Sequence, residues 1–305
     1  MANGNGIDWP ASVWQDINAA VLTEVGKVRI AQKVFPTMGL NDNATEVPNE
    51  VIKFADLSIE EGKTKPFVEI YQEFPLTSTQ MKKESESKIC KTLARMAVKA
   101  IALAEDIIIF QGEDGEPNLP ANVETDLLDS TARGLLGEAD PGDANDLDVN
   151  KVSEPIEVPP VVGRPGVLYG ENTFSAVTDG IAKLVRKAQA PNYALFLPTK
   201  VFADTFAPPS PQSLVTTADR IKPLVEGGFY GTGTLPHDRG LLVALGGEPT
   251  GLYVGREATT EFVRKEGSKY FFRVAERVQF VARDPRAFIL LKFLPVPVVV
   301  AAKKA

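Results

Sequence analysis

Histidine and cysteine, which carry much of the catalytic and metal-binding chemistry of proteins, are almost absent from this sequence. The 305 residues include one of each, Cys90 and His237. A single cysteine excludes an internal disulfide and a cysteine metal cluster, and we expect Cys90 to be a small packed side chain. His237 lies beside Asp238, so a general base is conceivable. Neither a Gly-x-Ser-x-Gly motif nor a cysteine partner accompanies it, which favours an ordinary loop histidine.

Motifs for nucleotides and metals are also missing. The glycines between residues 227 and 233 do not form Gly-x-Gly-x-x-Gly, and they follow an expected helix rather than a strand. The full phosphate-loop pattern does not occur. The run DPGDANDLD at 140–148 lacks the central glycine and the distal glutamate of a calcium loop, so we expect a solvated acidic loop. The sequence therefore predicts no catalytic residue, no cofactor and no metal, and a protein that is not an enzyme.

Long hydrophobic runs are absent as well. The most apolar stretch, 287–302, is interrupted by Lys292, Pro295 and Pro297, so we expect no membrane span. Residues 1–8 are polar and glycine-rich, unlike a signal peptide, and we expect synthesis in a reducing cytosol.

Acidic residues are concentrated in one segment. Residues 113–157 hold 13 acidic and two basic side chains, a net charge of −11, whereas the whole chain carries −7. The rest of the chain is therefore mildly basic. This distribution argues against a dedicated nucleic-acid reader with a broad basic stripe. It is compatible with a protein that encloses a polyanion without binding it tightly.

The stretch 82–112 is the longest with helical character, and its only glycine or proline is the final Gly112. Steps of three and four place Ile89, Leu93, Met96, Ala100, Leu103 and Ile107 on one face. We expect Ser85 or Ser87 to cap its start and Gly112 to end it. A helix of about 40 Å can act as a strut, although an ordinary core helix fits the same periodicity. The expected core residues of this helix are Ile89, Leu93, Met96, Ile107 and Ile108.

Residues 46–79 alternate apolar and polar side chains in two runs, 47–54 and 67–74, separated by a polar tip at 58–65. This pattern predicts a long β-hairpin. Because few nearby residues could cover it, we expect the hairpin to pack on another subunit. The expected contact residues are Phe54, Leu57, Ile59, Lys63, Lys65 and Phe67.

The remaining patterns predict an α+β fold. An amphipathic helix is expected at 7–26, a second at 172–188, and strands at 193–197, 241–245, 252–255, 259–264, 270–280 and 287–293. Glu105 and Asp106 precede the end of the long helix, where the helix dipole disfavours negative charge. A basic partner from elsewhere in the chain or from another subunit is therefore expected beside them.

Several stretches resemble encapsulin shell proteins. ALAEDIIIFQG at 102–112 is similar to the end of their spine helix, and KPFVEIYQEFPLTSTQ at 65–80 to the returning strand of their E-loop. Further likenesses are ARGLLG at 132–137, NYALFLPTKVFADTF at 192–206, GGFYGTGTLPHDRGLLVAL at 227–245 and RVQFVARDPRAFILLKF at 277–293. The resemblance implies the Hong Kong 97-type capsid fold of tailed phages. It implies an N-terminal arm or helix at 1–45, an E-loop at 46–80, a P-domain spine helix with the acidic segment at 81–164, an A-domain at 165–250, and P-domain return strands with a tail at 251–305.

This superfamily holds both phage major capsid proteins and encapsulins. The chain lacks the Gly-Arg-Arg element and the Gly-Pro-x-Gly turn usual in encapsulins, and it adds the acidic segment and the tail LPVPVVVAAKKA. These departures favour a major capsid protein in a phage virion, assembled in the host cytoplasm as pentamers and hexamers, with an encapsulin as the alternative. The implied partners are portal, scaffold or decoration proteins and enclosed double-stranded DNA, or a cargo enzyme's terminal peptide in an encapsulin. A scaffold fused to the N-terminus is not expected.

Some capsids of this fold are cross-linked by an isopeptide bond between a lysine of the E-loop and an asparagine of a neighbour's P-domain. Lys63 and Lys65 could serve as the lysine, but no asparagine follows Asn192. We therefore expect a shell held by non-covalent contacts.

Overall fold

The structure is a computed structural model that describes residues 7–39, 44–54, 56–126, 133–140, 151–161, 167–208 and 215–295. The chain forms two compact units, residues 1–135 with 250–283 and residues 136–249 with 284–305. Helices and strands are interspersed along both, which confirms the expected α+β class. No helix among the described residues is long and apolar enough to cross a membrane.

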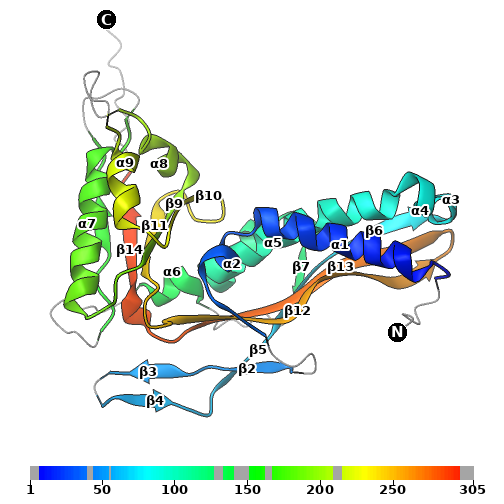
Figure 1. Cartoon of the computed structure of the whole chain (residues 1–305), viewed down its shortest axis with the longest axis horizontal. Coiled ribbons are helices and arrows are strands. Elements are labelled where there is room, and N and C mark those ends of the chain that lie inside the picture. The colour runs from blue at the N-terminus through cyan, green and yellow to red at the C-terminus, as the bar shows by residue number, and fades with distance from the viewer. Residues whose placement is uncertain are drawn as a thin grey trace, which may run out of the picture. The chain divides into compact units, whose positions relative to one another are not determined.

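The first unit is built on a five-stranded sheet in the order β1-β12-β13-β6-β7. Figure 1 labels β12, β13, β6 and β7 of this sheet. The long hairpin of β12 and β13 forms its centre, and both strands carry many buried side chains. β6 runs antiparallel to β13 for ten residue pairs, and β1 runs parallel to β12. The strands are β1 (Thr37–Gly39), β6 (Val68–Thr77), β7 (Glu124–Asp126), β12 (Thr250–Glu266) and β13 (Lys269–Ala282).

Two long helices pack on this sheet, α1 (Ala11–Val28) and α5 (Ile89–Gln111). They form one apolar core with β6 and β13, in which Phe272 stacks between Trp9 and Phe74. α1 begins four residues later than expected, since Pro10 is its N-cap rather than part of its first turn. Shorter helices are α2 (Ala31–Val34), α3 (Ser78–Lys82), α4 (Glu84–Ser87) and the 3-10 helix η1 (Gly112–Asn118).

The predicted helix 82–112 is interrupted twice, at Lys83 between α3 and α4 and at Lys88 between α4 and α5. Lys88 adopts the left-handed conformation, with φ 50°, and separates α4 from α5. The side chains of Ser85 and Ser87 do not cap α5. The buried Glu84 carboxylate does so instead, accepting from the backbone N–H groups of Cys90 at 2.8 Å and Lys91 at 3.1 Å. Gly112, with φ 63°, ends the helix as predicted.

The hairpin exists but is shorter than predicted. β2 (Glu46–Pro48) pairs with β5 (Thr64–Pro66), and β3 (Val51–Lys53) pairs with β4 (Ser58–Glu60). The chain therefore reverses between Lys53 and Ser58, and the expected tip 58–65 lies partly in β4 and β5. The second predicted run, 67–74, belongs largely to β6 in the five-stranded sheet, because β13 offers it a ten-residue partner. We call residues 46–66 the arm.

The second unit has its own five-stranded sheet in the order β10-β9-β11-β14-β8. α7 (Glu171–Arg186) packs against β8, β11 and β14, and Gly180 allows the close approach because a Cβ there would lie 2.8 Å from Leu242. The other elements are α6 (Gly134–Glu138), which spans the boundary between the units in the sequence, β8 (Ile156–Val158), β9 (Tyr193–Pro198), α8 (Thr199–Asp204), α9 (Thr217–Ile221), η2 (Lys222–Leu224), β10 (Gly228–Thr232), β11 (Arg239–Ala244), η3 (Pro285–Ala287) and β14 (Phe288–Phe293).

β14 does not join the sheet of β12 and β13, although the resemblance implies P-domain return strands throughout residues 251–305. It pairs antiparallel with β11 and parallel with β8, in the second unit. Its sequence FILLKF is apolar without strict alternation and is almost fully buried, which suits an inner strand of a covered sheet. β12 and β13 alternate instead and remain in the first unit.

Candidate assembly surfaces and a buried ion cluster

The arm presents apolar side chains that its own unit does not cover. Leu57 is 84% exposed and Ile59 is 53% exposed, whereas Phe54 is half-buried. Lys63 is exposed and pairs with Glu60 at 2.8 Å, and Lys65 is half-buried. A two-stranded ribbon with an uncovered apolar tip is marginally stable alone.

The base of the arm is anchored within the first unit. Val47 packs with Phe67, Tyr253 and Val281 in a small buried cluster, and the Ile52 N–H donates to the Arg283 carbonyl at 3.0 Å. Phe67 was expected at a contact with another subunit. It is instead 1% exposed within its own chain, because it belongs to the boundary between the arm and β6 rather than to the tip.

The spine helix α5 buries a different face from the one predicted. Ile107 and Ile108 are buried and Ile89 and Leu93 are half-buried, but Met96 is 64% exposed and Leu103 is 42% exposed. The helix has a second apolar stripe of small residues, and this stripe faces the core. Its buried members are Cys90, Ala94, Ala97, Val98, Ile101, Ala104 and Ile108. Met96 is therefore a surface residue, and with Leu103 it gives α5 an exposed apolar strip.

A groove of about 500 Å³ opens beside the start of α1. Trp9 forms part of its wall and is held by its indole N–H, which donates to the Met81 carbonyl at 3.1 Å. The walls are mostly apolar, with one charge of each sign. The lining side chains come from the start of α1, from α3 and α4, and from β13; they are Ile7, Asp8, Trp9, Pro10, Val13, Ser78, Met81, Lys82, Ser85 and Tyr270.

The outer faces of α1 and α5 are connected by ion pairs. The Glu24 carboxylate contacts Arg95 at 2.7 Å, Lys99 at 3.2 Å and Lys27 at 3.3 Å. Hydrogen bonds from Arg95 and Lys99 lower the pKa of Glu24 to about 2. These contacts keep Glu24 ionised and hold the two helices side by side.

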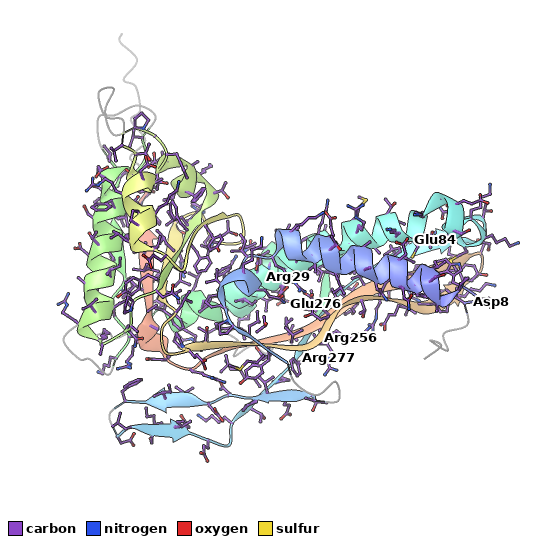
Figure 2. All side chains as sticks on the ribbon, viewed as in Figure 1. Asp8, Arg29, Glu84, Arg256, Glu276 and Arg277 are labelled. Atoms are coloured by element: carbon purple, nitrogen blue, oxygen red, sulfur yellow. The ribbon has the colours of Figure 1, made fainter. Side chains whose placement is uncertain are left out.

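A cluster of charged residues lies buried where α1 ends. Arg29 pairs with Glu105 of α5 and Glu276 of β13, and lies 3.5 Å from the half-exposed Glu257 of β12. Figure 2 shows Arg29 and Glu276 close together at the end of α1. Gln32 completes the cluster, accepting from Arg29 at 3.0 Å and donating to Glu105 at 2.8 Å.

Burial shifts the acid–base behaviour of this cluster. It raises the pKa of Glu105 well above its ordinary value, with the neighbouring Glu276 adding to the effect. It also raises the pKa of Glu276 to about 7, although Arg29 acts in the opposite direction. For Arg29, burial lowers the pKa, but the charges of Glu276 and Glu105 outweigh this and raise it.

Asp106 lies next to the cluster, and its carboxylate accepts hydrogen bonds from backbone N–H groups. Its carboxylate accepts from the N–H groups of Ile30 at 2.9 Å and Ala31 at 2.9 Å. Burial raises its pKa to about 6, partly offset by these two hydrogen bonds. The expected basic partner is present for Glu105, which pairs with Arg29 after α1. Asp106 is instead held by the backbone N–H groups of Ile30 and Ala31.

Sequence reasoning missed Arg29 and Glu276. A basic residue just after a helix is common, so the position of Arg29 gave no signal. Glu276 is one of several charged residues on its strand. The only usable signal was the position of Glu276, which has apolar Val274 and Val278 two residues away on each side, so it shares the buried face of β13.

The second unit exposes apolar side chains near α8 and η2. Phe206 is 42% exposed and Leu224 is 36% exposed, and Phe202 packs on Phe229 with ring centroids 4.9 Å apart. Lys222 lies over the Phe206 ring at 5.0 Å. His237 is exposed in the loop between β10 and β11. The described residues contain no group of three or more side chains suited to hold a metal; most of the run 140–148 lies outside them.

Comparison with known proteins identifies the fold. A protein-family model, Linocin_M18, described as "Encapsulating protein for peroxidase", matches residues 164–279. No curated protein sequence matches the chain. Among solved structures, a virus-like particle from Pyrococcus furiosus is similar at 16% identity and a TM-score of 0.65, over 92% of this chain and 99% of that one.

A capsid and an encapsulin are both among the similar structures. The capsid of a native GTA particle gives 16% identity and a TM-score of 0.56, over 87% of this chain and 90% of that one. The SrpI encapsulin from Synechococcus elongatus PCC 7942 gives 11% identity and a TM-score of 0.53, over 97% of this chain and 96% of that one. The chain therefore has the Hong Kong 97-type capsid fold, that of capsid-type shell proteins of both kinds, and the resemblance seen in the sequence is confirmed.

Proposed function

We propose that copies of this chain assemble into a closed icosahedral shell of the encapsulin type, built from pentamers and hexamers. The arm is the observation that carries the assembly proposal. Its uncovered Leu57 and Ile59 need an apolar surface, and a second copy offers one in the exposed Met96 and Leu103 of α5 or in the exposed side chains of the second unit. Self-association that closes by symmetry would bury them all.

In this proposal the segments keep the roles that the resemblance implies. Residues 46–80 act as the E-loop, the spine helix and the β12–β13 hairpin as the P-domain, and residues 165–250 as the A-domain, whose exposed Phe206 and Leu224 would meet other copies near a symmetry axis. β14 serves the A-domain side of the chain instead of the P-domain. The chain itself is structural and carries out no reaction.

The encapsulin type is favoured by the family match over residues 164–279 and by the groove beside α1. The groove has the apolar walls and the size to hold a short apolar terminal peptide of a cargo enzyme. Asp8 and Lys82 at its edge would pair with charges at the ends of that peptide.

A phage major capsid protein is the second candidate, because the acidic segment 113–157 and the tail 294–305 are additions that suit a larger head. Such a head would enclose double-stranded DNA without reading its sequence, would engage portal, scaffold or decoration proteins, and would be part of a virion assembled in the host cytoplasm.

Purified particles distinguish the two. We expect nuclease-treated particles to contain a second protein and no protected double-stranded DNA. We expect Lys82→Glu, a charge reversal at an exposed residue of the groove, to reduce that protein's occupancy several-fold without preventing assembly. Ser12→Asp, on the exposed side of α1, is the matched control and should retain the second protein. Nuclease-resistant double-stranded DNA of uniform length would favour the phage head instead.

A further inference from the structure

The buried cluster at the end of α1 has more negative than positive charge. Among the described residues, Arg29 is the only cation that forms ion pairs with it, and Glu105 and Glu276 both have fully buried side chains. Glu257 adds a third carboxylate that is 54% exposed. Two buried carboxylates on one guanidinium leave a net negative charge in a low-dielectric environment, which is costly unless it is neutralised.

The shared cation indicates how neutralisation occurs. The carboxylates of Glu105 and Glu276 both contact the one guanidinium of Arg29, so they lie close to each other. Two ionised carboxylates have acceptors only, so a hydrogen bond between them requires a proton on one. Within the described residues, the buried Oε1 of Glu276 has no other donor. A shared proton supplies the missing donor and removes the excess charge.

We propose that Glu105 and Glu276 hold one proton between them against Arg29, and that this proton latches the turn Arg29–Gln32 onto the spine helix. Losing the proton leaves two buried anions competing for one guanidinium, which favours opening of the turn. The latch joins the end of the N-terminal helix α1 to α5. In the proposed shell, the attachment of this N-terminal helix therefore depends on pH.

The charged groups around the latch come from every element packed there. Arg29 lies in the turn after α1, Lys33 on α2, Asp106 beside Glu105 on α5, and Glu257 on β12. Asp106 reports on the latch, since it accepts from the amides of Ile30 and Ala31. Those two N–H groups exchange with solvent when the turn opens.

The sign follows from linkage. Glu276 holds its proton to a pH of about 7 in the closed state, whereas an open, solvated glutamate loses it near its ordinary value of 4.5. The closed state therefore binds more protons between these values, and closure weakens as the pH rises through them.

The test is hydrogen exchange of the Ile30 and Ala31 amides in the assembled full-length chain at pH 6 and pH 8. The protection factors are corrected for the intrinsic pH dependence of exchange. From pH 6 to pH 8 we expect them to fall about tenfold in the native chain because the latch loses its proton, and about a further twofold because Asp106 does. In Glu276→Gln, a neutral mimic of the protonated acid, the fall should be about twofold or less. Glu257→Gln is the matched control and should keep the native dependence.

Should Glu276→Gln fail to fold, Glu105→Gln removes the other member of the pair and carries the same expectation. Protection that is equal at both pH values in the native chain would overturn the proposal. An equally large fall in both glutamine variants of the buried pair would overturn it as well.

Discussion

Ile108 and Met96 lie on the same helix in opposite environments. Ile108 is 8% exposed in the main apolar core of the first unit, whereas Met96 is 64% exposed. Aspartate at a buried position places an unpaired charge in an apolar environment, but at an exposed position it is hydrated.

We expect Ile108→Asp to lower the free energy of unfolding by on the order of 5 kcal/mol, enough to remove most soluble protein. Met96→Asp should change it by less than about 1 kcal/mol. Denaturant unfolding of the soluble variants and the soluble fraction on expression measure both. Equal yields of folded protein for the two variants would contradict this assignment of the core face.

The same residues show why periodicity did not select the right face. α5 carries a stripe of large side chains, including Leu93, Met96 and Leu103, and a neighbouring stripe of alanines with Cys90 and Val98. Both follow helical spacing, and large side chains score as more apolar. Small residues face the core here because α1 packs closely on α5, a tertiary constraint that a single helix does not reveal.

At the scale of elements, α5 depends on a carboxylate that lies before it in the chain. Glu84 is 3% exposed and caps the helix across the break at Lys88. Substitution leaves two amides of the first turn without their partner, which typically costs about 1–2 kcal/mol.

We therefore expect Glu84→Ala to lower the midpoint of thermal unfolding by a few degrees. Glu86→Ala, at an exposed site two residues later, should leave it unchanged. Scanning calorimetry of the two variants tests this, and identical midpoints would show that the cap contributes nothing.

Elements with strong alternation or uniform burial were predictable from sequence. The hairpin of β12 and β13, the strands β9 and β11, and α7 lie close to where their patterns placed them. The arm and β14 were assigned to the wrong partners because pairing is decided between segments distant in the sequence. The alternation of apolar and polar residues runs from the arm into β6 without a break. The pairing of β6 with β13 determines where the five-stranded sheet begins, and the sequence of the arm alone does not reveal it.

At the scale of the whole molecule, the fold was recognisable from sequence because several short motifs occur in the order of the encapsulin chain. The buried ion cluster was not, since it joins four segments, each of which carries one ordinary charge. The need for a basic partner could still be predicted from Glu105 and Asp106, two acids placed where the helix dipole disfavours negative charge.

A shell of this chain should be held together without covalent cross-links. No asparagine follows Asn192, so the β12–β13 hairpin has no amide side chain of asparagine for a lysine to attack. Particles boiled in detergent should give a single band near 33.0 kDa on a denaturing gel. A ladder of multimers that resists reductant would contradict this prediction.

The most direct test of the account is electron microscopy of the purified chain beside the variant Leu57→Lys/Ile59→Lys. The two substitutions replace the exposed apolar side chains of the arm and leave the buried core of both units untouched, so the variant should fold. We expect closed particles for the native chain and only unassembled chain or open capsomers for the variant, which should unfold at the same temperature as the unassembled native protein. Native chain that remains monomeric, or closed particles of normal size from the variant, would contradict it.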